Sequence, residues 1–199
     1  QAVVLDVSHL SDAGVEDLLG LVDGPVMASH SDVRDVAGRP RNLARWQVDE
    51  IVRRDGLIGL NFFAPFVGGD GLPTLDDLLR HADYVLEAGG EDVLALGADF
   101  DGSQGLFPEG VVGVQSMPDV RARFVSSLGE ELAEKIFFGN AVSFVDRVLW
   151  GYGAGPGPPA LLGRPLEQPT LSFLDTPSGA RRRRRLAVTA RVTDHAARG

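Results

Sequence analysis

At 199 residues the chain is long enough to fold as one domain of ordinary size. Its content of 44% hydrophobic and 24% charged residues is typical of a soluble globular protein, and no window resembles a membrane helix. The sequence has no cysteine, which excludes disulfides and thiolate metal sites. A bound metal must therefore use histidine and carboxylate ligands.

The net charge of −9 is unevenly distributed along the chain. Residues 151–199 carry eight arginines and three acidic residues, a charge of +5, so the first 150 residues carry −14. An acidic body argues against nucleic acid as the main partner. The five arginines at 181–185 leave open a nucleic-acid or membrane-surface patch, but a solvated, disordered tail is the favoured interpretation.

Short apolar runs and helical patterns alternate along the chain. The runs are near-continuously apolar, as in strands covered on both faces, and predict strands over residues 3–7, 25–29, 57–63 and 93–97. Apolar residues at helical spacing predict helices over residues 11–22, 42–56, 74–90, 116–128 and 129–149. In the first helix Ser11 and Asp12 are candidate N-caps. In the second, one apolar face is expected to hold Leu43, Trp46, Ile51 and Val52.

This order of strands and helices predicts an α/β fold with a parallel sheet. Four βα units suit half of a TIM-type barrel or a doubly wound sheet equally well. The pattern ends at residue 150, where a sequence rich in glycine and proline begins. We therefore expect a domain over residues 1–150 and a linker with a disordered tail over 151–199.

Two histidines follow consecutive predicted strands at equivalent places. His9 ends the first strand and His30 the second, each directly after a serine. The carboxyl ends of parallel strands are where the active sites of barrels and open α/β sheets form. Two imidazoles there suit a Zn²⁺ site, whereas a pair of hydrogen-bonded structural histidines is the competing interpretation.

The fourth strand ends in the sequence GADFDG, which makes Asp99 a candidate metal ligand or general base. Asp101 fits an ordinary turn signal. Arg39 and Arg41 follow His30, and an arginine there can hold a substrate carboxylate, although spacing alone favours a solvated loop cation. His81 is expected to be a packed or surface helix residue, and His195 lies in the tail.

Four motifs in order resemble the renal or membrane dipeptidase family. They are DVSHLSD at 6–12, PVMASHSDVRDVAGRPRN at 25–42, GLIGLNF at 56–62 and GADFDG at 97–102, and the resemblance extends to about residue 150. Members of this family are zinc metallopeptidases with a TIM-like barrel. The resemblance implies that this chain holds four βα units equivalent to strands 5–8, the C-terminal half of that barrel.

The resemblance also implies roles for single residues. His9 and His30 match the two histidines that bind one zinc of a pair, and Arg41 matches the arginine that grips the substrate's C-terminal carboxylate. Asp99 matches the aspartate that handles the proton of the metal-bridging hydroxide, which attacks the dipeptide bond. The family's H-x-D pair and bridging glutamate belong to the first half of the barrel. We therefore expect a fragment without them, with at most one partly liganded Zn²⁺.

Two other functions stay open at this stage. One is an amidohydrolase acting on another small amide, and the other is an inactive half-barrel that serves as an interaction or structural protein. Open sheet edges make a homo-oligomer a possible partner. The chain shows neither a signal peptide nor an anchor, so the expected location of the chain as given is the cytoplasm.

Overall fold

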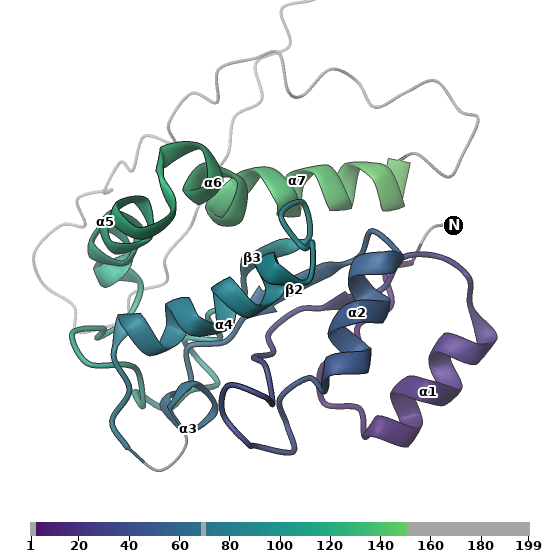
Figure 1. Ribbon diagram of the computed structural model, residues 1–199, viewed down its shortest axis with the longest axis horizontal. Coiled ribbons are helices and arrows are strands. Elements are labelled where there is room, and N and C mark those ends of the chain that lie inside the picture. Colours follow the sequence, from purple (N-terminus) through teal and green to yellow (C-terminus); the bar gives the residue numbers. More distant parts are fainter. Residues whose placement is uncertain (1–2, 69–70, 151–199) are drawn as a thin grey trace, which may run out of the picture. The chain divides into compact units, whose positions relative to one another are not determined.

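The computed structural model describes residues 3–68 and 71–150, and the predicted linker and tail at 151–199 lie outside the described residues. Figure 1 shows a small sheet between helices. The strands are β1 (Met27–Ala28), β2 (Leu57–Leu60) and β3 (Leu94–Leu96). The helices are α1 (Asp12–Leu21), α2 (Arg45–Arg53), α3 (Ala64–Val67), α4 (Leu75–Glu87), α5 (Met117–Leu128), α6 (Glu130–Glu134) and α7 (Asn140–Val145), with a 3₁₀ turn η1 (Val114–Ser116) and two π-helical segments, η2 (Lys135–Gly139) and η3 (Asp146–Trp150).

The three strands form a parallel sheet in the order β1-β2-β3. Met27 pairs with Leu57, and Ile58 pairs with Leu94. Helix α2 connects β1 to β2, and α4 lies between β2 and β3 in the chain. The predicted α/β class and the parallel sheet are confirmed. The assignment to half of a barrel stays a prediction.

The predicted first strand is wrong in its extent. Residues 3–7 contribute only one parallel bridge, between Asp6 and Met27. Val7 N–H donates to the Met27 carbonyl at 2.8 Å, and Met27 N–H donates to the Leu5 carbonyl at 2.9 Å. Val3 is exposed, so the start of this segment lies outside the packed sheet and only its end is held beside β1. We call residues 3–7 the edge segment.

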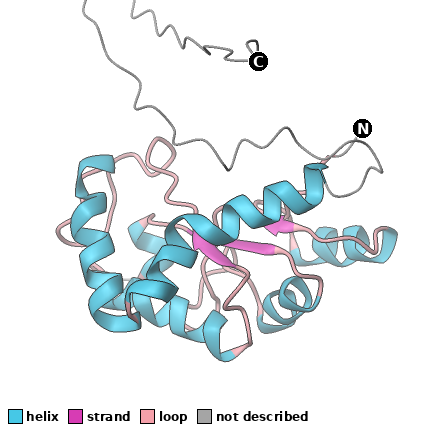
Figure 2. Cartoon of the chain, turned by 90° about the horizontal axis from the view of Figure 1, so that it is seen from above, coloured by secondary structure: helices cyan, strands magenta, loops and turns pink. Residues whose placement is uncertain are grey.

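Helices cover both faces of the sheet, as the view from above shows (Figure 2). Ile58 and Leu94 belong to the main core, which includes the buried face of α4. Leu57 and Ala95 belong to a second cluster on the opposite side, where they pack with Phe144 of α7. The second face of the sheet is thus partly covered by α7.

Two local details of the first helices follow from hydrogen bonding. Ser11 caps α1, because its hydroxyl accepts from Gly14 N–H at 3.2 Å. In α2 the expected apolar face is wrong at Trp46, which is 42% exposed. Gln47 is buried instead, because its side-chain oxygen accepts from Ala44 N–H and its amide donates to Asp12.

The helix predicted over 129–149 is built from α6, η2, α7 and η3 in succession. Helical backbone angles at the junctions keep it continuous while two segments adopt π-helical hydrogen bonding. Asn140 anchors it, since its amide donates to the carbonyls of Glu91 at 2.8 Å and Leu94 at 2.7 Å. Among the described residues, no helix is both long and apolar enough to cross a membrane.

His81 of α4 is fully buried, so it is the packed helix residue and not the surface one that the sequence left open. Val33 N–H donates to its Nδ1 at 3.1 Å, and its Nε2 lies 2.9 Å from the Val67 carbonyl, to which it donates. Burial lowers the pKa of His81, which the hydrogen bond to Val67 opposes. The neutral ring therefore joins the loop at Val33 and the end of α3 to α4.

Replacing His81 with leucine is expected to lower the free energy of unfolding by about 3 kcal/mol, because it leaves a buried N–H and a buried carbonyl unpaired. Urea denaturation followed by circular dichroism measures the change. The exposed neighbour Arg80, replaced with alanine, serves as control and costs less than about 1 kcal/mol. Equal effects of the two substitutions would contradict this role.

The stability difference between the wild type and His81→Leu is also expected to depend on pH. Because the folded state lowers the pKa of His81 below 6.5, the unfolded chain binds the proton first as the pH falls. The wild type therefore loses this part of its stability below pH 6.5, and the difference shrinks between pH 7.5 and 5.5. A difference that grows on acidification would contradict the neutral buried ring.

Candidate metal centre

The structure brings His9 and His30 into contact at the carboxyl end of the sheet. His9 follows the edge segment, and His30 follows β1 after Ser29. Their Nε2 atoms are 2.8 Å apart, and their ring centroids are 4.8 Å apart. Pairing of the edge segment with β1 places both loops at the same end of adjacent strands. The expected proximity is present, while the role of the pair as metal ligands stays a prediction.

Two of the four predicted site residues have an unusual backbone conformation. His9 has φ 71° and Asp99 has φ 54°, in the left-handed region that side chains other than glycine rarely adopt. Such conformations persist where surrounding structure holds them, and they cluster at functional sites. Asp99 is held by Ser103, whose N–H and hydroxyl both donate to the Asp99 carbonyl.

Burial and the charge of Arg41 favour the neutral form of His30. Burial, and next the charge of Arg41, lower its pKa, against the opposing effect of Asp99. Ser29 Oγ lies 2.7 Å from His30 Nδ1 and donates to Asp6 Oδ2 at 2.5 Å. Burial raises the pKa of Asp6, but hydrogen bonds from Ser29 and Ser8 outweigh it, so that the net pKa is lowered.

Arg41, and not Arg39, lies beside the histidine pair. Its guanidinium donates to Ser31 Oγ at 2.7 Å and to the His30 carbonyl at 2.9 Å, and it lies over the Phe66 ring. Arg39 donates instead to the Pro65 carbonyl. Ser31 Oγ is also 3.2 Å from Ser8 Oγ, so a hydrogen-bonded chain connects Arg41 to the loop that carries His9.

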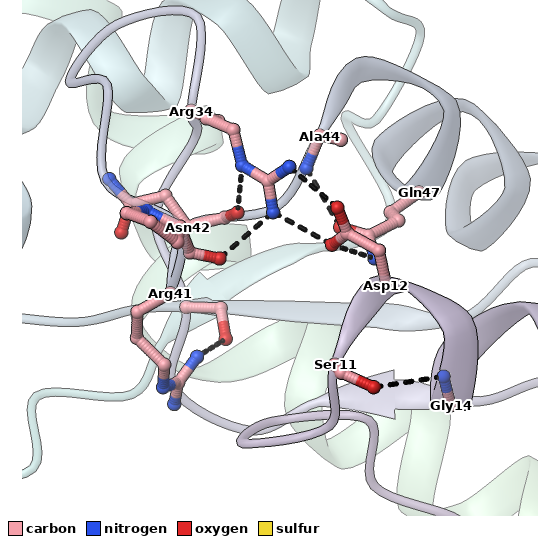
Figure 3. A network of polar contacts seen from close by, with 10 residues as sticks. Ser11, Asp12, Gly14, Arg34, Arg41, Asn42, Ala44 and Gln47 are labelled. Atoms are coloured by element: carbon pink, nitrogen blue, oxygen red, sulfur yellow. Dashed lines mark hydrogen bonds and ion pairs between the residues drawn. The ribbon is translucent and has the colours of Figure 1, made fainter.

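The loop that carries Arg41 is held by a second network, shown in Figure 3. Arg34 makes a bidentate ion pair with Asp12 at the start of α1, with both distances 2.8 Å. It also donates to the carbonyls of Asn42 and Pro40. This clamp fixes both ends of the loop.

Asp32 is a buried carboxyl group close to the site. It is fully buried, and Asn61 N–H donates to its Oδ1 at 3.1 Å. Burial raises its pKa well above the usual range, against the Asn61 hydrogen bond and the charge of Arg41. Asp32 thus lies near enough to Arg41 for the two charges to interact.

The sequence analysis missed Asp6, Ser29, Ser31 and Arg34. The repeated Ser-His dipeptide at 8–9 and 29–30 is the sequence feature that could have pointed to Ser29. Asp6 and Arg34 gave no such signal, because their partners lie more than 20 residues away. His195 lies outside the described residues.

The donor set fits part of a zinc site. Neutral imidazole nitrogens are common zinc ligands, and two on one ion stand about 3.3 Å apart, given Zn–N bonds of about 2.05 Å. The 2.8 Å separation needs only a small outward movement. Within residues 3–68 and 71–150, no group of three or more histidine, aspartate or glutamate side chains is arranged to hold a metal.

Two His-x-Asp triplets occur in the chain, at 30–32 and 81–83, although no such triplet was expected in this part of the barrel. In the first, Asp32 is buried against Asn61, and in the second His81 is bonded to two backbone groups.

Comparison with known proteins identifies the family of the chain. A sequence model described as membrane dipeptidase (peptidase family M19) matches residues 1–149. The chain belongs to the membrane dipeptidase family. Among its relatives, dipeptidase ataJ of Aspergillus terreus is 31% identical over 149 residues, which cover 73% of this chain and 36% of the relative.

Two solved members of the family have the same local fold. An M19 metallopeptidase described as dipeptidase AC gives a TM-score of 0.68 at 32% identity, covering 72% of this chain and 44% of that one. A metallopeptidase from Rhodobacter sphaeroides, liganded with a phosphinate mimic of the dipeptide L-Ala-D-Ala, gives 0.68 at 32% identity, covering 72% and 42%. The chain thus spans less than half the length of these relatives.

If the left-handed backbone at Asp99 is imposed by the site, Asp99→Gly is expected to be more stable than Asp99→Ala by about 1 kcal/mol. Denaturant unfolding of the two variants measures the difference. At the exposed helical residue Asp17 the order is reversed, because glycine is the poorer helix former. If Asp99→Ala were as stable as Asp99→Gly, this would contradict backbone strain at residue 99.

Proposed function

We propose that this chain is the C-terminal part of a zinc-dependent dipeptidase, with residues 1–150 equivalent to strands 5–8 of a TIM-like barrel. The contact between His9 and His30 at the carboxyl end of a parallel sheet, with Arg41 beside it, carries the proposal. Family membership and the two solved relatives support it.

His9 and His30 would hold the metal through their Nε2 atoms, which face each other. Zn²⁺ bound there would supply Lewis acidity, polarising the scissile carbonyl and lowering the pKa of a water. The lowered pKa of His30 suits this role, since only a neutral imidazole has a lone pair to donate. Groups outside the described residues would complete the coordination.

Arg41 would bind the substrate's C-terminal carboxylate. Its guanidinium is half-buried on Ser31, His30 and Phe66, which fixes its direction at a set distance from the histidines. An arginine held in this way makes strong, charge-assisted contacts to a carboxylate. A fixed distance between this anchor and the metal selects substrates with one residue after the scissile bond, which are dipeptides.

Asp99 would move the proton from the attacking water to the leaving amine. It follows β3 at the same end of the sheet, is exposed, and lies close enough to His30 to influence its pKa. A carboxylate in this place accepts a proton and returns it in the next step.

A non-catalytic half-barrel is the second candidate, favoured by the lack of a three-residue ligand group among the described residues. The two candidates differ in what the purified protein does with zinc and a dipeptide.

Mixed with a chain that supplies the first half of the barrel, the 199-residue chain is expected to hydrolyse L-Ala-D-Ala when Zn²⁺ is present, and to lose this activity with a chelator. His30→Ala should abolish the activity, because it removes one of the two metal ligands that this chain supplies. Ninhydrin detection of released alanine measures the rate, and circular dichroism checks folding. A folded mixture without zinc-dependent hydrolysis would contradict the proposal and favour the non-catalytic half-barrel.

Replacing Arg41 with alanine is expected to lower kcat/KM for the dipeptide by about 10- to 100-fold, which is the value of one or two charge-assisted hydrogen bonds. The same dipeptide with a C-terminal amide lacks the carboxylate, so its kcat/KM should barely change. Arg39→Ala is the matched control and should leave the preference for the free acid intact. Equal losses with both substrates would argue against carboxylate binding by Arg41.

A further inference from the structure

Asp6, Ser29 and His30 form a relay that ends at the histidine pair. Asp6 Oδ2 accepts from the Ser29 hydroxyl at 2.5 Å, and Ser29 Oγ lies 2.7 Å from His30 Nδ1. The other carboxylate oxygen, Asp6 Oδ1, accepts from the backbone N–H groups of Ser8 at 2.9 Å and Ser29 at 3.0 Å. Every contact of Asp6 in this relay is therefore made as an acceptor.

The direction of each hydrogen bond follows from counting protons. An ionised carboxylate has no proton to donate, and a serine hydroxyl has one. Ser29 uses its single proton for Asp6, so its contact with His30 must be made as an acceptor. His30 then carries its proton on Nδ1, which leaves the lone pair on Nε2, the atom that faces His9.

We propose that Asp6 and Ser29 are positioning residues for the metal ligand His30, because their relay fixes the ring's proton on Nδ1 and directs the Nε2 lone pair to the cation. This rests on the proposed function in so far as it assigns a metal to the histidine pair. Partners of this kind set the tautomer and orientation of histidine ligands and raise metal affinity.

The backbone of Ser29 packs closely against two glycines at the sheet, which holds this residue of the relay in place. A Cβ added to Gly59 of β2 would lie 2.3 Å from the Ser29 carbonyl oxygen, and one added to Gly97 would lie 1.9 Å from it. Both distances are far inside van der Waals contact, so only glycine allows Ser29 to approach the sheet this closely. The serine is thus held from its backbone as well as from its hydroxyl.

The substitution Asp6→Asn is expected to reverse the direction of the hydrogen bonds in the relay, while the side chain keeps almost the same shape. The two backbone N–H groups that face Oδ1 require an oxygen there, which turns the amide NH₂ toward Ser29. Ser29 then accepts from the amide and donates to His30 Nδ1, which moves the ring proton to Nε2. Ser29→Ala removes the relay, whereas Ser29→Thr keeps a hydroxyl in the same place.

The test is the tautomer of His30 in the metal-free protein, read from long-range ¹H–¹⁵N spectra of the full chain above pH 7.5, with the signals assigned by His30→Ala. We expect the proton on Nδ1 in the wild type and Ser29→Thr, on Nε2 in Asp6→Asn, and mixed in Ser29→Ala. Ser31→Ala, a neighbouring serine outside the relay, should leave the tautomer unchanged. A wild-type ring protonated on Nε2, or one unaffected by Asp6→Asn, overturns the proposal.

A second measurement, Zn²⁺ affinity by chelator competition, separates this proposal from the function. Asp6→Asn and Ser29→Ala should weaken the Kd for Zn²⁺ by about 10- to 100-fold, with recovery in Ser29→Thr. Unchanged affinity in variants with a shifted tautomer overturns the link from relay to metal. A wild-type chain with the Nδ1 tautomer and no zinc binding refutes the metal site of the proposed function, while the relay itself is upheld.

Discussion

Two backbone hydrogen bonds between the edge segment and β1 place the histidine pair. Val7 N–H and the Leu5 carbonyl both bond to Met27, which aligns the end of the edge segment with the end of β1. The turns that follow therefore begin at the same level, and His9 and His30 meet through their Nε2 atoms. A register shift of one residue would turn each side chain to the opposite face of the sheet and separate the pair.

The rest of the site depends on the same alignment. Asp6 pairs with β1 through its backbone and with Ser29 through its side chain, so one residue fixes both the strand and the histidine next to it. Arg41 contacts the His30 carbonyl, and its loop is tied to α1 by Arg34 and Asp12. Two polar networks therefore hold the site, one at the start of α1 and one around Arg41 and His30.

The sequence predicted those features that depend on local pattern. Apolar runs located β2 and β3, and the spacing of leucines located α4, because burial on a sheet or helix face imposes a period. The predicted extent of the first strand is wrong. A short apolar run does not show which of its residues pair with a neighbouring strand, and here Asp6 is paired while Val3 is exposed. The hydrophobicity of Trp46 predicts a buried side chain, but this side chain is exposed. Gln47 is buried in its place, because its side chain is hydrogen-bonded.

Among the site residues, His9, His30, Arg41 and Asp99 were proposed from their places after strands or from family motifs. Their partners could not be found in this way, because the contact of Ser29 with Asp6 spans 23 residues and exists only once the strands are paired. The left-handed backbone conformation of His9 and Asp99 is likewise a property of the folded chain, because neither residue type predicts it.

A structure determined from crystals of the chain soaked in Zn²⁺, with data collected on both sides of the zinc absorption edge, tests whether the histidine pair binds the metal. An anomalous peak is expected between His9 Nε2 and His30 Nε2. Zinc bound elsewhere on the chain, with those two nitrogens still in direct contact, would contradict it.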